Sequence, residues 1–328
     1  MTWTDWPKIE LHLHLEGAAP PAFIRSVAAE KGVDLSAIFR DDGNYAYRDF
    51  AHFLSVYEAA SSVLTGPEDF YRLTRAVLEE STKAGVVYGE TFLSPDFCGG
   101  ADPGAWREYL AAIRQAADEV EAEGGTALRG IVTCIRHFGP EKAKPAALCA
   151  AETAGDWLVG FGMAGAEDMG QQSDYAYSFD MAREAGLRLT SHAGEWRGPA
   201  EVRAAVEDLG VERVGHGVRA IEHAATVAML VEKGVTLEVC PGSNVVLGVV
   251  PDWASHPIEK LRAAGVKVTV STDDPPFFHT TMPQEYAMLE KTFGWGEDTF
   301  RAVNKTALDA AFCNEETRKR VEKRLETA

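Results

Sequence analysis

The chain has 328 residues, of which 46% are hydrophobic and 25% are charged, a composition typical of a soluble globular protein with ample core residues. Its 32 basic and 50 acidic residues leave a net charge of −18. This balance argues against nucleic acid or a membrane surface as a partner, because phosphate groups are bound by basic surfaces. It fits an enzyme that acts on a neutral or cationic small molecule, and it indicates nothing about the oligomeric state.

The chain begins with residues 1–7, which lack the basic and apolar regions of a signal peptide. No stretch approaches the ~18 consecutive apolar residues that a membrane helix needs. The five cysteines are scattered and form no Cys-x-x-Cys pair, so we expect them to be reduced and mostly buried. These features together predict a cytoplasmic protein.

The first predicted element is a strand at 8–16, where apolar and polar side chains alternate with a period of two. A long segment at 18–85 follows, with helices predicted at 20–32, 48–64 and 67–84. It is too long for a simple strand-to-helix connection, so we expect part of it to lie over one end of the fold. The aromatic-rich helix 48–64 is predicted to help close a pocket there, the alternative being an ordinary helix packed on the surface.

The rest of the chain alternates between strands and helices. Strands are predicted at about 86–94, 126–135, 157–163, 187–193, 213–216, 235–240 and 266–272. Helices are predicted at 103–123, 140–153, 173–185, 199–209, 222–233 and 255–264, and two or more close the chain from Pro283 onward. Eight strands separated by helices predict a parallel (β/α)8 TIM barrel, with extra helices after the first strand and at the C-terminus. No linker interrupts the pattern, so we expect one domain over 1–328.

Histidines and acids fall at the carboxyl ends of four predicted strands. Side chains two apart in a strand share a face, so the two histidines of the first strand lie side by side. The residues at strand ends are His12, His14, His192, Glu195, His216, Asp273 and Asp274. Catalytic residues in such barrels come from the carboxyl ends of the strands, so we expect all seven to meet on one rim.

Four segments resemble, in the same order, the motifs of the adenosine/adenine deaminase family of metal-dependent hydrolases. They are His12-Leu13-His14, His192-Ala193-Gly194-Glu195, Gly215-His216-Gly217 and Ser271-Thr272-Asp273-Asp274-Pro275. The resemblance spans essentially the whole chain. It implies a zinc-containing (β/α)8 barrel that hydrolyses the 6-amino group of a small-molecule purine to a carbonyl and releases ammonia.

The resemblance implies one Zn²⁺ per chain, with His12, His14, His192 and Asp273 as its ligands. Three imidazoles and a carboxylate leave room for a bound water, whose pKa falls toward ~7 on zinc. The resemblance also implies that Glu195 protonates purine N1 while hydroxide adds to C6. This role requires a protonated carboxyl group, which burial in an apolar pocket favours.

Further site residues follow from the same resemblance. His216 and Asp274 match catalytic residues that orient the hydroxide, and Asp274 also accepts a hydrogen bond from the substrate. Gly165 matches a glycine whose backbone N–H meets purine N3, and His14 and Glu16 complete the predicted substrate-binding set. The structural alternatives are a core histidine at position 216, a helix cap at 274 and a plain turn glycine at 165.

Asp273 and Asp274 are adjacent and would face apart on a regular strand, so the chain must bend for both to reach the site. His279 follows closely enough to line the pocket. For Glu238 and Ser243-Asn244 a structural role and a role beside the site both stay open. The other histidines are expected in helices or loops, without a role in the site: His52, His137, His223 and His256.

The substrate is less clearly indicated than the chemistry. Nucleoside deaminases of the family typically have Asp where this chain has Glu16, which favours an adenine-type enzyme. The segments around Gly165 and His216 resemble the nucleoside branch instead. Two features against one favour adenosine and 2′-deoxyadenosine, deaminated to the inosine nucleosides, as substrates. Adenine or another 6-aminopurine, such as an N6-substituted adenine or an aminodeoxyfutalosine-like compound, is the alternative.

Two other interpretations compete with the deaminase. Related amidohydrolases cleave phosphoesters or cyclic amides and commonly bridge two metals with a lysine from the fourth strand. Residues 157–165 contain no lysine, which favours a site with a single metal. A binding or regulatory protein that kept the fold but lost turnover is the non-catalytic alternative, and the intact set of catalytic positions argues against it.

Overall fold

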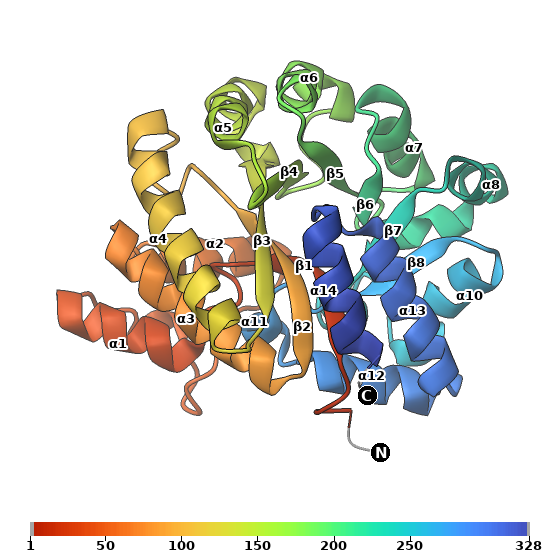
Figure 1. Cartoon of the computed structure of the whole chain (residues 1–328), viewed down its shortest axis with the longest axis horizontal. Helices are drawn as coiled ribbons and strands as arrows, with labels where there is room; N and C mark the ends of the chain where they lie inside the picture. The colour runs from red at the N-terminus through yellow and green to blue at the C-terminus, as the bar shows by residue number, and fades with distance from the viewer. Residues whose placement is uncertain (1–2, 327–328) are drawn as a thin grey trace.

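The computed structural model describes residues 3–326 and contains a sheet of eight parallel strands in the order β1 to β8 (Figure 1). The strands are β1 (Lys8–His14), β2 (Val86–Leu93), β3 (Ala127–Ile135), β4 (Leu158–Ala164), β5 (Arg188–Ala193), β6 (Arg213–His216), β7 (Thr236–Val239) and β8 (Lys267–Val270). Helices surround the sheet, so the predicted (β/α)8 TIM barrel is confirmed. Each strand lies within a few residues of its predicted place.

Many helices begin at proline, whose missing N–H is not needed in the first turn. The helices are α1 (Pro21–Lys31), α2 (Phe50–Ser61), α3 (Pro67–Lys83), α4 (Pro103–Ala122), α5 (Pro140–Thr153), α6 (Ala176–Glu184), α7 (Pro199–Asp208), α8 (Ala224–Lys233), α9 (Pro241–Val246), α10 (Ile258–Ala263), α11 (Pro275–Phe278), α12 (Met282–Phe293), α13 (Glu297–Ala310) and α14 (Glu315–Glu326). The sequence did not predict the short helices α9 and α11, which each follow a strand of the barrel rim. No helix within residues 3–326 has both the length and the apolar character needed to span a bilayer.

The barrel closes where the segment after β8 meets β1. The N–H of Asp273 donates to the carbonyl of His12 at 3.1 Å, and the N–H of His14 donates to the carbonyl of Asp273 at 3.1 Å. The Ser271 hydroxyl oxygen accepts from the N–H groups of Leu11 and His12, both at 3.2 Å. These bonds hold Asp273 beside the two histidines of β1.

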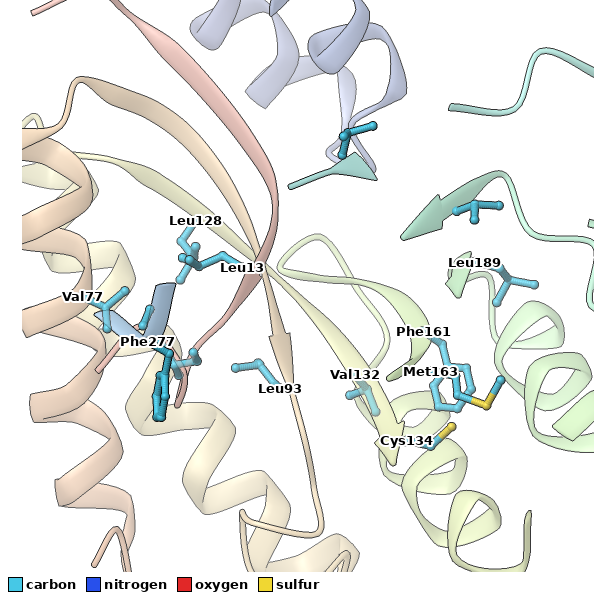
Figure 2. Close-up of a cluster of buried hydrophobic side chains, with 14 of the residues drawn as sticks. Leu13, Val77, Leu93, Leu128, Val132, Cys134, Phe161, Met163, Leu189 and Phe277 are labelled. Carbon is cyan, nitrogen blue, oxygen red and sulfur yellow. The ribbon is translucent and has the colours of Figure 1, made fainter. Parts of the chain in front are cut away.

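Buried apolar side chains join the strands to the surrounding helices. Figure 2 shows members of this core on three neighbouring strands, among them Leu93 of β2, Val132 and Cys134 of β3, and Phe161 and Met163 of β4. All five cysteines are buried and free of disulfide bonds, as predicted.

The long connection between β1 and β2 carries α1, α2 and α3, which lie on one side of the barrel (Figure 1). Phe53 of α2 packs against Phe277 and Phe278 of α11, with ring centroids 5.3 Å apart in both pairs. Since α11 directly follows Asp274, this contact places α2 over the rim where the strand ends gather. The connection therefore lies over one end of the fold, as expected from its length.

The C-terminal helices pack on the opposite part of the strands. A second buried cluster joins Ile9 and Leu11 of β1 and Val87 of β2 to Leu308 of α13 and Val321 of α14. In Figure 1, α14 accordingly lies near the centre of the barrel and α13 lies beside it. These helices thus cover the N-terminal parts of β1 and β2, and the carboxyl ends remain for the site.

Candidate active site

The four predicted metal ligands lie together at the barrel rim. His12 and His14 come from β1, His192 from β5, and Asp273 from the segment after β8, and their ligand atoms all lie within 4.8 Å of one another. His14 Nε2 lies 3.3 Å from His192 Nε2. Asp273 Oδ1 lies 3.3 Å from His14 Nε2 and 3.4 Å from His12 Nε2. The structure therefore brings residues from opposite ends of the chain to one point.

The hydrogen bonds around these histidines fit a bound cation. His192 Nδ1 lies 2.8 Å from the carbonyl oxygen of Met163, so it carries the proton and Nε2 keeps its lone pair. His12 Nδ1 lies 2.8 Å from the Glu238 carboxylate, and its buried Nε2 has no hydrogen-bond partner among residues 3–326. Two imidazole lone pairs beside the Asp273 carboxylate form a donor set that suits zinc.

Glu238, whose role the sequence left open, lies at the centre of a buried network behind His12. Its other oxygen accepts hydrogen bonds from Thr190 Oγ1 at 2.9 Å and from Arg213 Nε at 2.6 Å. Arg213 also forms an ion pair with Glu90 at 2.6 Å. Because a ligand histidine is oriented by the group that its other nitrogen contacts, Glu238 fixes the direction of His12 Nε2.

The chain bends at Asp273, whose φ of +68° lies in the left-handed region that non-glycine residues rarely adopt. The bend lets Asp273 and Asp274 both line the same cavity, as expected. Ser243 Oγ donates a hydrogen bond of 2.7 Å to Asp273 Oδ2, so Ser243 also lies beside the site. A Cβ atom at Gly17 would lie 1.5 Å from Asp274 Oδ1, so this close approach requires glycine.

Glu195 lies just after β5, is buried and lines the cavity. Burial, and secondly the charge of Asp273, raise the pKa of Glu195 well above its usual value, which favours the protonated acid at neutral pH. Its turn is held by Glu167, which accepts from the backbone N–H groups of Glu195 at 3.1 Å, Trp196 at 2.6 Å and Arg197 at 2.9 Å. The sequence predicted no role for Glu167, because nothing local shows which loop it will meet.

His216 and Asp274 complete the polar side of the cavity. His216 has a φ of +59°, and its Nε2 lies 3.8 Å from both Glu195 Oε2 and Asp273 Oδ2. Asp274 Oδ1 is buried without a hydrogen-bond partner among residues 3–326. Burial, and secondly the charge of Asp273, raise the pKa of Asp274 well above its usual value. Asp274 therefore adds a second buried carboxyl group to the lining of the cavity.

The cavity has a volume of about 80 Å³ and is lined by apolar side chains as well as by metal ligands. The apolar wall comes mainly from α2, which contributes Phe50, Phe53, Leu54 and Tyr57. The helix predicted at 48–64 thus lies on the cavity, and its role in closing it stays a prediction. His279 is not among the lining residues.

Gly165 lines the cavity with a φ of +105°. A Cβ atom here would lie 2.6 Å from His137 Nδ1, and the N–H of Ala166 donates to the same nitrogen at 3.2 Å. Both the backbone conformation and the close contact require glycine. His137 itself lines the cavity, although the sequence predicted no role for it in the site.

Glu16 does not line the cavity. It is buried, and its Oε2 lies 3.4 Å from the hydroxyl group of Tyr57, which does line it. Burial raises the pKa of Glu16 to about 7. Of the predicted site residues outside the metal cluster, Glu195, His216, Asp274 and Gly165 line one cavity and Glu16 lies next to it through Tyr57.

Comparison with known proteins agrees with this geometry. The family model described as adenosine deaminase matches residues 7–328. Proteins named adenine deaminase from Rhizobium johnstonii and Rhizobium rhizogenes are 47% and 49% identical to this chain, each over 95% of it and 96% of the relative. The crystal structure of adenine deaminase from Arthrobacter aurescens superposes with a TM-score of 0.89 at 29% identity, over 98% of both chains. Given these matches over nearly its whole length, this chain belongs to the adenosine deaminase family.

Proposed function

We propose that this protein is an adenine deaminase, which hydrolyses adenine to hypoxanthine and ammonia with one Zn²⁺ per chain. The observation that carries the choice of substrate is the 47% and 49% identity to proteins named adenine deaminase. It favours the alternative drawn from the sequence over adenosine, which two of three sequence features had favoured.

The apolar wall of the cavity supports a planar heterocycle as substrate. The aromatic wall from Phe50, Phe53 and Tyr57 suits the faces of a flat ring.

The metal would be held by the cluster at the rim, namely His12, His14, His192 and Asp273. Zinc, when bound there, supplies a Lewis acid that lowers the pKa of water toward ~7. Glu238 and Ser243 orient two of the ligands through their hydrogen bonds.

The other residues have separate tasks in the proposed reaction. Glu195, protonated in the free enzyme, gives its proton to purine N1 as the C–O bond forms at C6. Asp274, which lines the cavity, accepts a hydrogen bond from the reacting groups, and His216 orients the attacking oxygen. Cleavage of the C6–N bond then releases ammonia, whose third hydrogen comes from the added water, and the other hydrogen of that water restores the Glu195 carboxyl group. The N–H of Gly165 is assigned to N3, and His14 lies on the substrate side of the metal cluster.

A substrate panel tests the proposal. Ammonia release and the change in purine absorbance are measured for adenine, adenosine, 2′-deoxyadenosine and N6-methyladenine with the zinc-loaded protein. Adenine is expected to have a kcat/KM at least ~10²-fold above that of adenosine. Efficient turnover of adenosine with none of adenine would overturn the substrate and keep the chemistry, and turnover of no purine would overturn both.

A further inference from the structure

His216, Asn244 and His256 form a buried hydrogen-bonded chain, of which the proposed deaminase chemistry uses His216 alone. Asn244 Nδ2 lies 3.2 Å from His216 Nδ1, and Asn244 Oδ1 lies 3.2 Å from His256 Nε2. The backbone N–H of Ile258 donates to His256 Nδ1 at 3.1 Å. His216, Asn244 and His256 are each at most 1% exposed. The sequence left Asn244 open and predicted no role for His256.

The donor and the acceptor of each hydrogen bond among these side chains follow from the bond between Ile258 and His256. A backbone N–H can only donate, so His256 Nδ1 must present a lone pair to Ile258. A neutral imidazole carries one proton, which then lies on His256 Nε2, and burial lowers the pKa of His256 to about 3. His256 Nε2–H therefore donates to Asn244 Oδ1. The Asn244 amide is left with its N–H facing His216 Nδ1, which must accept.

We propose that His256 and Asn244 are positioning residues, which hold His216 in the tautomer with its proton on Nε2. Nε2 lies 3.8 Å from both Glu195 Oε2 and Asp273 Oδ2, too far for a hydrogen bond to either. The Nε2–H group is thus left to donate to the attacking oxygen, which His216 orients in the proposed function. His216 acts there as a hydrogen-bond donor of fixed orientation.

The fold explains why this arrangement needs distant residues. His216 ends β6, Asn244 belongs to α9, and His256 follows a short 3-10 helix, η5 (Trp253–Ser255). The positive φ of His216 turns its ring toward the cavity. A neutral imidazole ring can carry its proton on either nitrogen. The group that contacts Nδ1 therefore decides which tautomer His216 adopts. Asn244 alone could also rotate its amide by 180°, and His256 removes that freedom.

The role in catalysis rests on the proposed function, whereas the tautomer can be measured without any substrate. Nitrogen-15 spectra of histidine-labelled, zinc-loaded protein distinguish Nε2–H from Nδ1–H rings. Both His216 and His256 are expected to be Nε2–H. His216→Gln and His256→Gln assign the two signals. His223→Gln serves as the control, because His223 does not belong to the hydrogen-bonded group of His216, Asn244 and His256. A wild-type His216 with its proton on Nδ1 would overturn the proposal.

Matched variants test the function of the hydrogen bonds that link His216, Asn244 and His256. His256→Leu and Asn244→Leu remove a donor, and both are expected to lower kcat at least ~10-fold while KM changes less than ~3-fold. His256→Gln keeps an N–H where Nε2 was and is expected to return kcat to within ~3-fold of wild type. Loss in the glutamine variant equal to that in the leucine variant, with unfolding temperature and zinc content unchanged, contradicts the proposal. If no purine is deaminated, the spectra still decide the tautomer, so failure of the proposed function is recognised separately.

Discussion

Glu238 and His12 share a buried hydrogen bond of 2.8 Å, and this bond aims His12 Nε2 at the other three metal ligands. The carboxylate comes from β7 and the imidazole from β1, on the two strands that flank β8. The negative charge of Glu238 is held by Arg213, whose guanidinium also pairs with Glu90. The metal cluster is therefore supported by charges inside the barrel as well as by the rim.

Replacing Glu238 by glutamine tests this support. Glu238→Gln keeps the shape but removes the charge that strengthens the bond from His12, so zinc affinity is expected to fall ~10–100-fold. Competition with a chelator of known affinity measures it. Glu285→Gln, which replaces a buried acid whose hydrogen bonds go to Gly242 and Thr280, is the control and should retain zinc. Equal affinities in wild type and Glu238→Gln would contradict the role of Glu238.

The metal cluster itself predicts about one zinc per chain. His14→Ala and Asp273→Ala each remove one ligand, so elemental analysis should find little bound zinc in either, and activity should be lost with it. Chelation of the wild type should abolish activity, and added zinc should restore it. Full metal occupancy and full activity in either variant would remove that residue from the site.

Glu195→Gln separates the acid from the metal. Glutamine has nearly the same shape as glutamic acid, but its amide group cannot deliver an acidic proton to N1. Turnover of adenine should fall at least ~10²-fold, with zinc content and unfolding temperature unchanged. A fall smaller than about tenfold would exclude Glu195 as the general acid.

The strand ends account for the success of the sequence analysis. His12, His192 and His216 lie among the last three residues of β1, β5 and β6, Asp273 follows β8, and the barrel geometry brings such ends together. The same rule placed Glu238 near the site but could not show that it faces His12. That depends on which side of β7 points inward, which is set by packing between strands.

Residues in loops could not be predicted in this way. His137 and Glu167 meet the site through contacts between segments that follow different strands, and no local pattern reports such contacts. Asn244 reaches His216 because α9 begins immediately after β7, and this short helix gave too few residues for a periodic signal. The tertiary arrangement of loops, rather than residue type, decides these positions.

Glu285 gives the stability of the protein a predictable pH dependence. Its oxygens accept hydrogen bonds from the N–H of Gly242 and the hydroxyl of Thr280, yet burial raises its pKa from 4.5 to about 8. Between these two values the folded state holds a proton that the unfolded state has lost, so this group's contribution to stability falls as pH rises. Glu285→Gln mimics the protonated acid and lacks this loss.

The free energy of unfolding of Glu285→Gln, relative to wild type, should therefore increase from pH 5 to pH 8. Urea unfolding at a series of pH values measures the difference. A difference that stays constant across this range would show that Glu285 titrates normally in the folded protein.

The contact between Glu16 and Tyr57 leads to the prediction that bears on the substrate. Glu16 lies outside the cavity and reaches it through the hydroxyl group of Tyr57, at 3.4 Å. In an adenine deaminase Glu16 then acts on the substrate by holding the ring of Tyr57. Glu16→Ala and Tyr57→Phe each break this hydrogen bond, worth ~1 kcal/mol, and each should raise KM for adenine about 3–10-fold. The double variant should be no worse than either single one, because both remove the same interaction.

Glu16 would instead contact a ribose hydroxyl directly in a nucleoside deaminase. In that case Glu16→Ala would lower kcat/KM for adenosine about 10–100-fold, leave adenine nearly unchanged, and add to the effect of Tyr57→Phe. Measuring both substrates with the three variants therefore decides which molecule Glu16 serves.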